Sequence, residues 1–143
     1  MSGVAVIRYL LTQASAVTTI IPAARIMAGD APLNTAKPLI LVTQISSVPF
    51  NLLRINETNK MHSDRVQVSF IFNGPLATVT GTGYPGVAAM AKLVLAACPS
   101  QRGTVNSIAV DSITPDSEGP DLYDDDTKMY SRSLDFIVKW IGA

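Results

Sequence analysis

Two stretches of the sequence alternate between apolar and polar residues, and this period of two constrains the fold more than any other feature. Residues 65–72 carry an apolar side chain at every second position, and residues 130–141 contain the same pattern. Successive side chains of a β-strand point to opposite faces, so both runs predict strands with one buried and one open face. The largest apolar residues of the two runs, Phe70, Phe136 and Trp140, are predicted to lie in the core.

Two further segments have the signals of helices. Ser2 can cap a first helix, whose apolar residues recur at helical spacing up to Ala14. Residues 85–98 predict a second helix, which begins at a proline and ends before another. Because Lys92 is the only charged residue in this segment, the second helix is expected to be buried nearly all round.

The rest of the chain supplies connections and two more predicted strands. Residues 39–45 are apolar on both faces at first and predict a strand covered on both sides. Residues 104–113 predict a strand with a register break near Val105, whereas residues 25–31 are irregular and residues 46–63 indicate a long loop or a ragged hairpin arm. The order α-β-β-α-β-β predicts an α+β fold, with a mostly antiparallel sheet of about four to five strands and two helices packed on one face.

The chain is poor in charged residues for its size. Asp, Glu, Lys and Arg make up 15% of its 143 residues, whereas about 25% is typical of globular proteins. The length suits one domain, so we expect residues 1–143 to fold as a single unit. A surface with so few charges is explained if other subunits cover much of it. The charges are also unevenly distributed, because residues 1–102 have a net charge of +5 and residues 103–143 one of −5.

Composition argues against several classes of protein. Cys98 is the only cysteine, so no internal disulfide can form. The longest apolar stretch, residues 87–98, has 12 residues and contains Lys92, whereas a transmembrane helix needs about 20. The formal net charge of 0 gives no reason to expect a nucleic-acid-binding protein. We therefore expect a soluble protein with no membrane partner.

No motif for catalysis, cofactor binding or metal binding is complete. Residues 81–86 have the Gly-x-Gly-x-x-Gly spacing, but no acidic residue follows about 20 positions later to hold a ribose, and a phosphate loop would need a Gly-Lys-Ser/Thr end. His62 and Cys98 lack an evident third group that would orient a nucleophile–base pair. The supply of His and Cys also falls short of a zinc site. We predict no enzyme, no cofactor and no metal, and a buried Cys98.

An acidic run near the C-terminus has no basic residue among its members. Its spacing differs from that of a calcium-binding loop, which needs Gly at position 6 and Glu at position 12. The run is compatible with a solvated loop between two strands, with weak cation binding, or with a contact surface that meets a basic patch or lines a passage for DNA. Its central residues are Asp121, Asp124, Asp125 and Asp126.

Six segments of the chain form a series that resembles a known family. They are the N-terminal helix of residues 4–13, VTTIIP at 17–22, RIMAGDAP at 25–32, KPLILV at 37–42, RVQVSF at 65–70 and YSRSLDFIV at 130–138. In order and spacing they resemble the tail-completion and tail-terminator proteins of tailed bacteriophages, including the small tail-to-head joining group. The resemblance covers nearly the whole chain, although the Gly- and Thr-rich residues 73–83 are longer than the family usually has there.

The resemblance implies a structural virion protein without a catalytic role. Such proteins form a ring, usually of about six copies, at the head-proximal end of the tail tube. The ring stops tube growth and presents a surface to the head connector. The implied partners are further copies of the chain, the tail tube protein and the head connector or stopper protein, while DNA passes through the ring without specific binding. The implied location is the virion, at the tail or neck, after assembly in the cytoplasm of the bacterial host.

The uneven charge suits head-to-tail packing in such a ring, because unlike patches of adjacent copies would meet. The candidate contacts between subunits, or with the lumen, are Asp121, Asp124, Asp125, Asp126, Arg54 and Arg65. Two alternatives stay open. One is another neck or head-completion adaptor, which would bind filled heads rather than isolated tails. The other is a small ligand-binding domain or enzyme that uses the glycine loop of residues 81–86, which a thermal shift with nucleotides would test.

Overall fold

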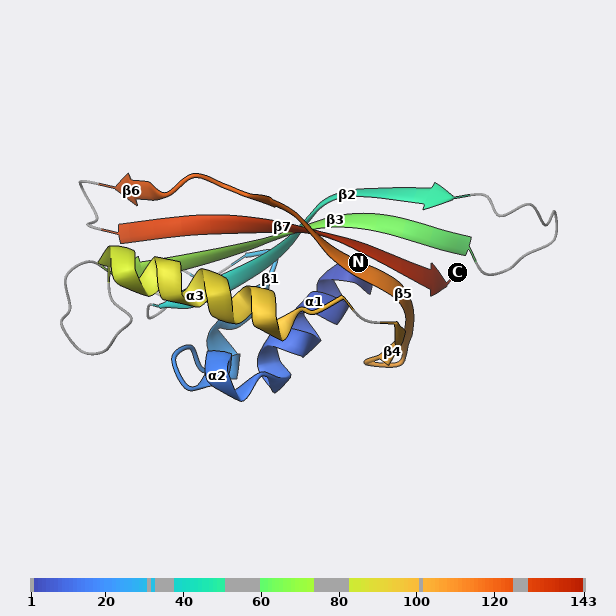
Figure 1. The fold of residues 1–143 in the computed structure, drawn as a ribbon, viewed down its shortest axis with the longest axis horizontal. Helices are drawn as coiled ribbons and strands as arrows, with labels where there is room; N and C mark the ends of the chain where they lie inside the picture. Colours follow the sequence, from blue (N-terminus) through green and yellow to red (C-terminus); the bar gives the residue numbers. More distant parts are fainter. Residues whose placement is uncertain are drawn as a thin grey trace.

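One twisted sheet organises the fold, and the helices lie on one of its faces (Figure 1). The computed structural model describes residues 2–30, 32, 38–50, 60–73, 83–100, 102–124 and 129–142. Seven strands form the sheet in the order β1-β2-β3-β7-β5-β4, and β6 also pairs with β7. The strands are β1 (Ile26–Ala28), β2 (Leu39–Phe50), β3 (Lys60–Asn73), β4 (Gly103–Val105), β5 (Ile108–Glu118), β6 (Leu122–Asp124) and β7 (Met129–Gly142).

The two alternating runs of the sequence become the central strands, β3 and β7. These strands pair antiparallel over their whole length, with Val68 opposite Leu134 and Val66 opposite Phe136. The alternating apolar residues of both strands, from Val66 to Phe72 and from Leu134 to Trp140, point to the helix-covered face and are buried, as predicted for Phe70, Phe136 and Trp140. The polar residues between them point to the other face, which is why the alternation is regular.

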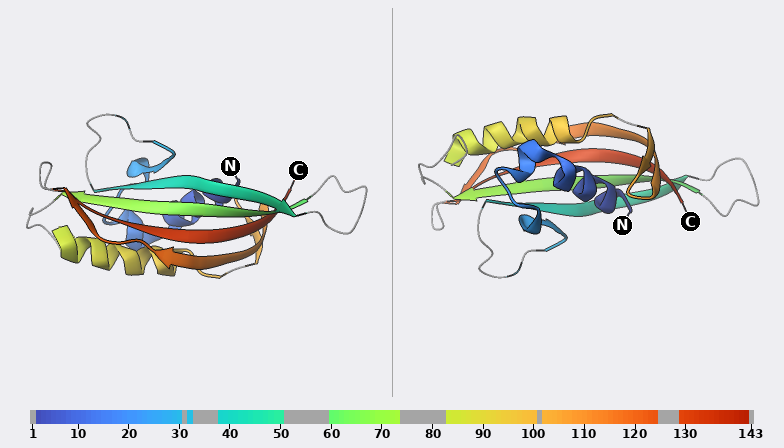
Figure 2. Two further views of the ribbon diagram at one scale, coloured as in Figure 1. Left: turned by 90° about the horizontal axis from the view of Figure 1, so that it is seen from above. Right: turned by 90° about the horizontal axis from the view of Figure 1, so that it is seen from below.

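The helices are α1 (Ser2–Gln13), α2 (Ser15–Thr18) and α3 (Gly83–Ala97), with a 3-10 turn at Ala23–Arg25. Figure 2 shows them in front of the sheet from one side and behind it from the other. The predicted stripe of α1 is confirmed, since Val4, Ile7 and Leu11 are all buried. The expectation that the second helix is buried nearly all round is wrong, because Lys92, Leu95 and Ala96 of α3 are exposed. This helix packs at the margin of the body, so one side meets solvent.

The α+β class is confirmed, but the expected strand count and order are wrong. The sheet is mixed, because β1 runs parallel to β2. The segment expected to be irregular contains β1, and the expected break near Val105 is the turn of a hairpin between β4 and β5. Residues 46–50 and 60–63, expected in a loop or ragged arm, extend β2 and β3 into a regular ladder. These strand ends were not predicted because their residues are polar and show no apolar alternation. Pairing with neighbouring strands, rather than a local pattern, holds them in place.

The expectation that β2 is covered on both sides holds only at its start, where Leu39 is buried as well as Ile40. Ile40 and Val42 are buried against the helices, whereas Ile45 is 51% exposed. In the part of the chain that the structure describes, no helix packs on the opposite face of the sheet. The sequence predicted two covered faces because Leu39 and Leu41 alternate with the equally apolar Ile40 and Val42.

The hairpin between β4 and β5 turns through two residues with positive φ. Asn106 has a φ of 50° and Ser107 one of 65°. Two left-handed residues in a two-residue loop are the signature of a type I′ turn, in which the second position favours glycine. An L-residue with a side chain in this conformation is strained by roughly 1–2 kcal/mol.

Replacing Ser107 by glycine is therefore expected to stabilise the protein. The gain should be about 1 kcal/mol, because glycine adopts the left-handed conformation without strain. For a chain of this length the melting temperature should rise by about 2–4 °C, which calorimetry would measure. Ser131→Gly, in the regular pairing of β7 with β3, is the matched control and should lower the melting temperature instead. Equal shifts in the two variants would contradict the turn assignment.

Candidate assembly surface

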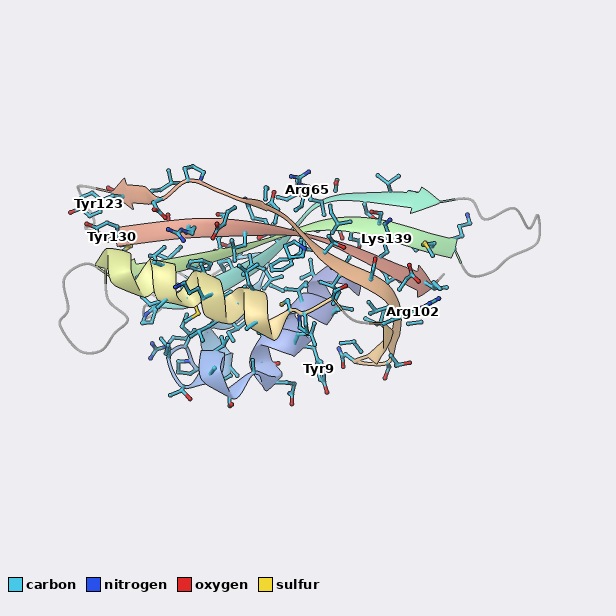
Figure 3. All side chains as sticks on the ribbon, viewed as in Figure 1. Tyr9, Arg65, Arg102, Tyr123, Tyr130 and Lys139 are labelled. Carbon is cyan, nitrogen blue, oxygen red and sulfur yellow. The ribbon has the colours of Figure 1, made fainter. Side chains whose placement is uncertain are left out.

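A cluster of charged residues lies on the face of the sheet opposite the helices. Arg65 of β3 donates to Asp135 of β7 through Nε, at 3.1 Å from Oδ2. Its Nη2 atom also pairs with Asp116 of β5. Ser117 completes the cluster by donating to the same Asp135 oxygen at 3.3 Å. Figure 3 shows Arg65 projecting from this open face. The cluster ties three neighbouring strands together and gives both carboxylates an arginine partner within the chain.

A second arginine, Arg132 of β7, pairs with two acids near β6. Its Nε atom donates to Asp121, and its Nη1 atom lies 3.6 Å from Oε1 of Glu118. Next to this group, Tyr123 and Tyr130 pack with their ring centroids 4.5 Å apart, at the end of the sheet shown in Figure 3. This end of the molecule therefore presents both acidic and aromatic groups.

The acidic run is a strand rather than a loop as far as the structure describes it. Asp124 lies in β6, which pairs with β7, and Asp121 immediately precedes it. The structure brings Asp121 to Arg132 and Arg65 to other acids, but it does not bring these two candidate residues to one another. Asp125, Asp126 and Arg54 lie outside the described residues.

The two margins of the sheet differ in how they resist further pairing. Strand β5 has register shifts on either side of Asp111 and of Asp116, and it contains Pro115, which lacks an N–H group. Bulges, prolines and charges are the usual means by which edge strands avoid pairing with other chains. This margin is therefore blunted.

The opposite margin, β2, also has a bulge, between Gln44 and Ser46, and a proline, Pro49, but it carries no charged residue along residues 43–48. Strand β1 pairs with β2 only up to Val42, where the N–H of Gly29 donates to the Val42 carbonyl at 2.9 Å. Gly29 has a φ of +82°, which turns the chain away. Within the described ranges, the rest of β2 has no strand on its outer side. Its residues Thr43 to Val48 are uncharged, so this edge is bare.

A hollow of about 210 Å³ opens at the blunted margin, where β5 bulges beside α3. Leu95, Pro115 and Leu134 provide its apolar surface. The acids that line it, Asp116, Glu118 and Asp135, are those paired with Arg65 and Arg132. The hollow is lined by Leu95, Pro115, Asp116, Ser117, Glu118, Leu134 and Asp135. It is too small for most ligands, which occupy roughly 300–1,000 Å³, but it suits an apolar side chain.

Asp64 joins distant parts of the fold through buried hydrogen bonds, a role that the sequence pattern did not predict. It is fully buried in β3. Its Oδ2 atom accepts hydrogen bonds from the backbone N–H of Gly3 at 3.0 Å and from Nε1 of Trp140 at 2.8 Å. Its other oxygen accepts from the hydroxyl of Ser47. Because Gly3 lies at the start of α1, Asp64 satisfies a donor of the helix N-terminus from a distant strand.

The close approach of Asp64 explains why position 3 is glycine. A Cβ atom there would lie 2.7 Å from the Asp64 Cβ, closer than such atoms can approach. The signal that could have revealed Asp64 is the phase of the alternation, since it falls in step with Val66, Val68 and Phe70 on the buried side.

The residues considered for catalysis do not form a reactive pair. His62 stacks on Trp140, with ring centroids 4.2 Å apart, whereas Cys98 is buried in the apolar core. No group of three or more metal-ligating side chains occurs among the described residues. Of the glycine loop, residues 83–86 belong to α3 and residues 81–82 lie outside the described part. None of the helices described is long and apolar enough to cross a membrane.

Cys98 is expected to resist thiol reagents while the protein is folded. Burial raises the pKa of its thiol to about 12, so at pH 8 only about one thiol in ten thousand is ionised, and the thiolate is the reactive form. Labelling with a disulfide reagent should be at least about a hundredfold slower than in the urea-unfolded chain, and it should accelerate as the pH rises. Labelling of the folded protein at the rate of a free thiol would show that Cys98 is accessible.

Comparison with known proteins identifies the fold. No protein-family model and no curated protein matches the chain. A chain from the virion of a native gene transfer agent particle is 12% identical, with 97% of this chain and 94% of that chain covered and a TM-score of 0.68. A second solved structure, whose name describes no function, is also 12% identical, covers 96% of this chain and 95% of its own, and has a TM-score of 0.50. At this identity the likeness shows a shared fold.

Proposed function

We propose that this protein is a structural virion subunit that forms a ring at the head-proximal end of a phage tail tube. The ring, of about six copies, ends tube growth and joins the tail to the head connector. The observation that carries the proposal is the shared fold, over nearly the full length of both chains, with a chain of a gene transfer agent virion. The order of the segments, which resembles the tail-terminator family, supports the same assignment.

The surface of the molecule is consistent with a subunit that contacts other copies on two sides. Charged residues are few, and several of the described acids are already paired with Arg65 or Arg132. A bare strand edge and a blunted edge with an apolar hollow occupy opposite margins of one sheet. Two unlike patches on one subunit allow head-to-tail contacts, which close into a ring when the rotation is right.

Native mass over a wide range of concentration, with and without purified tail tubes, tests the proposal. A closed multimer of about six copies, bound at one end of the tubes, is the expected result. Binding to filled heads but not to tubes would favour another neck adaptor. A protein that stays monomeric and leaves the tube ends unbound would refute the ring assignment.

Asp121, Asp124, Asp125, Asp126, Arg54 and Arg65 are proposed contacts of this ring with neighbours or the lumen. Replacing Asp124, Asp125 and Asp126 together by asparagine should weaken assembly because it removes three charges, while the melting temperature should change little. Joining of tails to heads by the triple variant would be counted against the wild type. Normal joining would show that the acids make no contact that matters.

A further inference from the structure

We propose that Ile45 and Val48, on the bare edge of β2, dock into the hollow beside β5 of a neighbouring copy of this chain. The inference rests on the proposed ring and names the contact that would build it. Ile45 is 51% and Val48 52% exposed, which is unusual for two aliphatic residues on one short strand segment. Val48 points to the open face, because the adjacent Ser47 points inward to Asp64.

The two patches are placed for a contact that repeats in one direction. Strands β2 and β5 lie on opposite sides of the central pair, β3 and β7, as the view from above in Figure 2 shows. A contact between two different patches leaves one of each unused on every pair of copies. Further copies therefore add in the same sense until the chain of copies closes. A contact of β2 with β2 would instead stop at a dimer.

The chemistry of the hollow suits an aliphatic side chain. Leu95 of α3 is 37% exposed and faces the hollow with Pro115 and Leu134. The acids around it are already partnered, since Asp116 and Asp135 pair with Arg65 and Glu118 pairs with Arg132. Covering the hollow with another subunit would thus bury no acid without an arginine partner, although each arginine is shared by two acids.

The chemistry of the β2 edge suits the same contact. Residues 43–48 carry no charge, so this edge can be removed from water without desolvating an ionised group. Charged side chains are one of the means by which monomeric proteins keep an exposed strand edge from pairing, and the β2 edge has none along this segment. The same sheet blunts its other margin with two bulges, a proline and acids. Since β2 also has a bulge and a proline, the two margins differ mainly in charge. This difference is expected if the β2 edge is covered by a copy of the chain, whereas the β5 margin contributes a hollow rather than a ladder.

Three glutamate substitutions separate this contact from general surface effects. Val48→Glu and Leu95→Glu should each weaken multimer formation by about tenfold or more, because each places a charge in an apolar contact. Tyr9→Glu is the matched control, since Tyr9 is 38% exposed and projects from α1 away from the sheet (Figure 3). It should assemble as the wild type does. Melting temperatures of all three variants show whether the monomers remain folded.

A disulfide experiment identifies the partner patch directly. The Val48→Cys, Leu95→Cys double variant should form a ladder of linked chains under mild oxidation, with or without tail tubes, while each single variant stays unlinked. Cys98 does not compete because it is buried. Dimers of the Val48→Cys single variant would overturn the proposal in favour of two β2 edges in contact. Absence of a ladder in both conditions would also overturn it.

The outcomes distinguish the inference from the proposed function. If the wild type and both glutamate variants form rings and cap tubes equally well, the docking contact is wrong and the ring assignment stands. If the wild type caps no tubes but the double variant forms the ladder, the contact is correct and the ring function is wrong.

Discussion

Replacing Asp64 by alanine is expected to destabilise the protein by about 3–5 kcal/mol, because the change leaves two buried donors and one partly buried donor without an acceptor. The donors are the N–H of Gly3, Nε1 of Trp140 and the hydroxyl of Ser47. Gly3 begins α1 and Trp140 lies near the end of β7. The substitution therefore removes hydrogen bonds from the N-terminus of α1, from β2 and from β7 at the same time. Urea unfolding would measure the loss as a lower midpoint with an unchanged slope.

The matched control is Asp64→Asn, which keeps the shape of the side chain and one acceptor oxygen. That oxygen can still accept from Gly3 and Trp140, while the new amide can donate to Ser47. We expect this variant to lose clearly less stability than Asp64→Ala. Trp140 is the only tryptophan, so its fluorescence reports on the hydrogen bond in both variants. Equal midpoints for the wild type and Asp64→Ala would show that these hydrogen bonds do not stabilise the fold.

Replacing Phe136 by alanine is expected to cost about 3–5 kcal/mol through loss of apolar contact and formation of a cavity. Phe136 is fully buried in β7, where it lies between Val66 on one side and Pro115 on the other. A domain of this size has roughly 5–15 kcal/mol of stability. The variant should therefore unfold at a much lower temperature, or fail to accumulate, when measured by calorimetry and soluble yield.

Ile137→Ala provides the comparison for Phe136→Ala. Ile137 is the next residue of the same strand but points to the open face and is only half-buried, so its truncation should cost about 1 kcal/mol or less. The two variants thus test the register of β7 as well as its packing. A larger loss at Ile137 than at Phe136 would mean that the strand is turned by one residue.

The central part of the fold was predictable because its residues carry a regular pattern. The alternation around Phe70 and Phe136 determined which strands form and which face they bury. The strands β1 and β6 were not predictable, since three residues are too few to show a period. Both exist because a longer neighbour, β2 or β7, offers them hydrogen bonds. Short strands of this kind are a tertiary property rather than a local one.

The candidate surface was predictable in composition but not in arrangement. The sequence located the acids, yet it could not show that Arg65 pairs with Asp116 and Asp135, because these partners lie far away in the chain. The bare and blunted edges likewise depend on strand order. Asp64 stood between a segment expected to be a loop, residues 46–63, and the predicted strand of residues 65–72, and only its phase with Val66 indicated that it points inward.

The pairing of β3 with β7 determines when the newly made chain can fold. The residues of β7 emerge from the ribosome last among the described strands, and they insert between β3 and β5 at the centre of the sheet. Pairings between such distant segments form slowly, because a long loop must close first. The hairpin of β2 and β3 must therefore wait for the rest of the chain. A chain cut before Met129 lacks the strand that holds both halves of the sheet together, so we expect such a truncated chain not to fold.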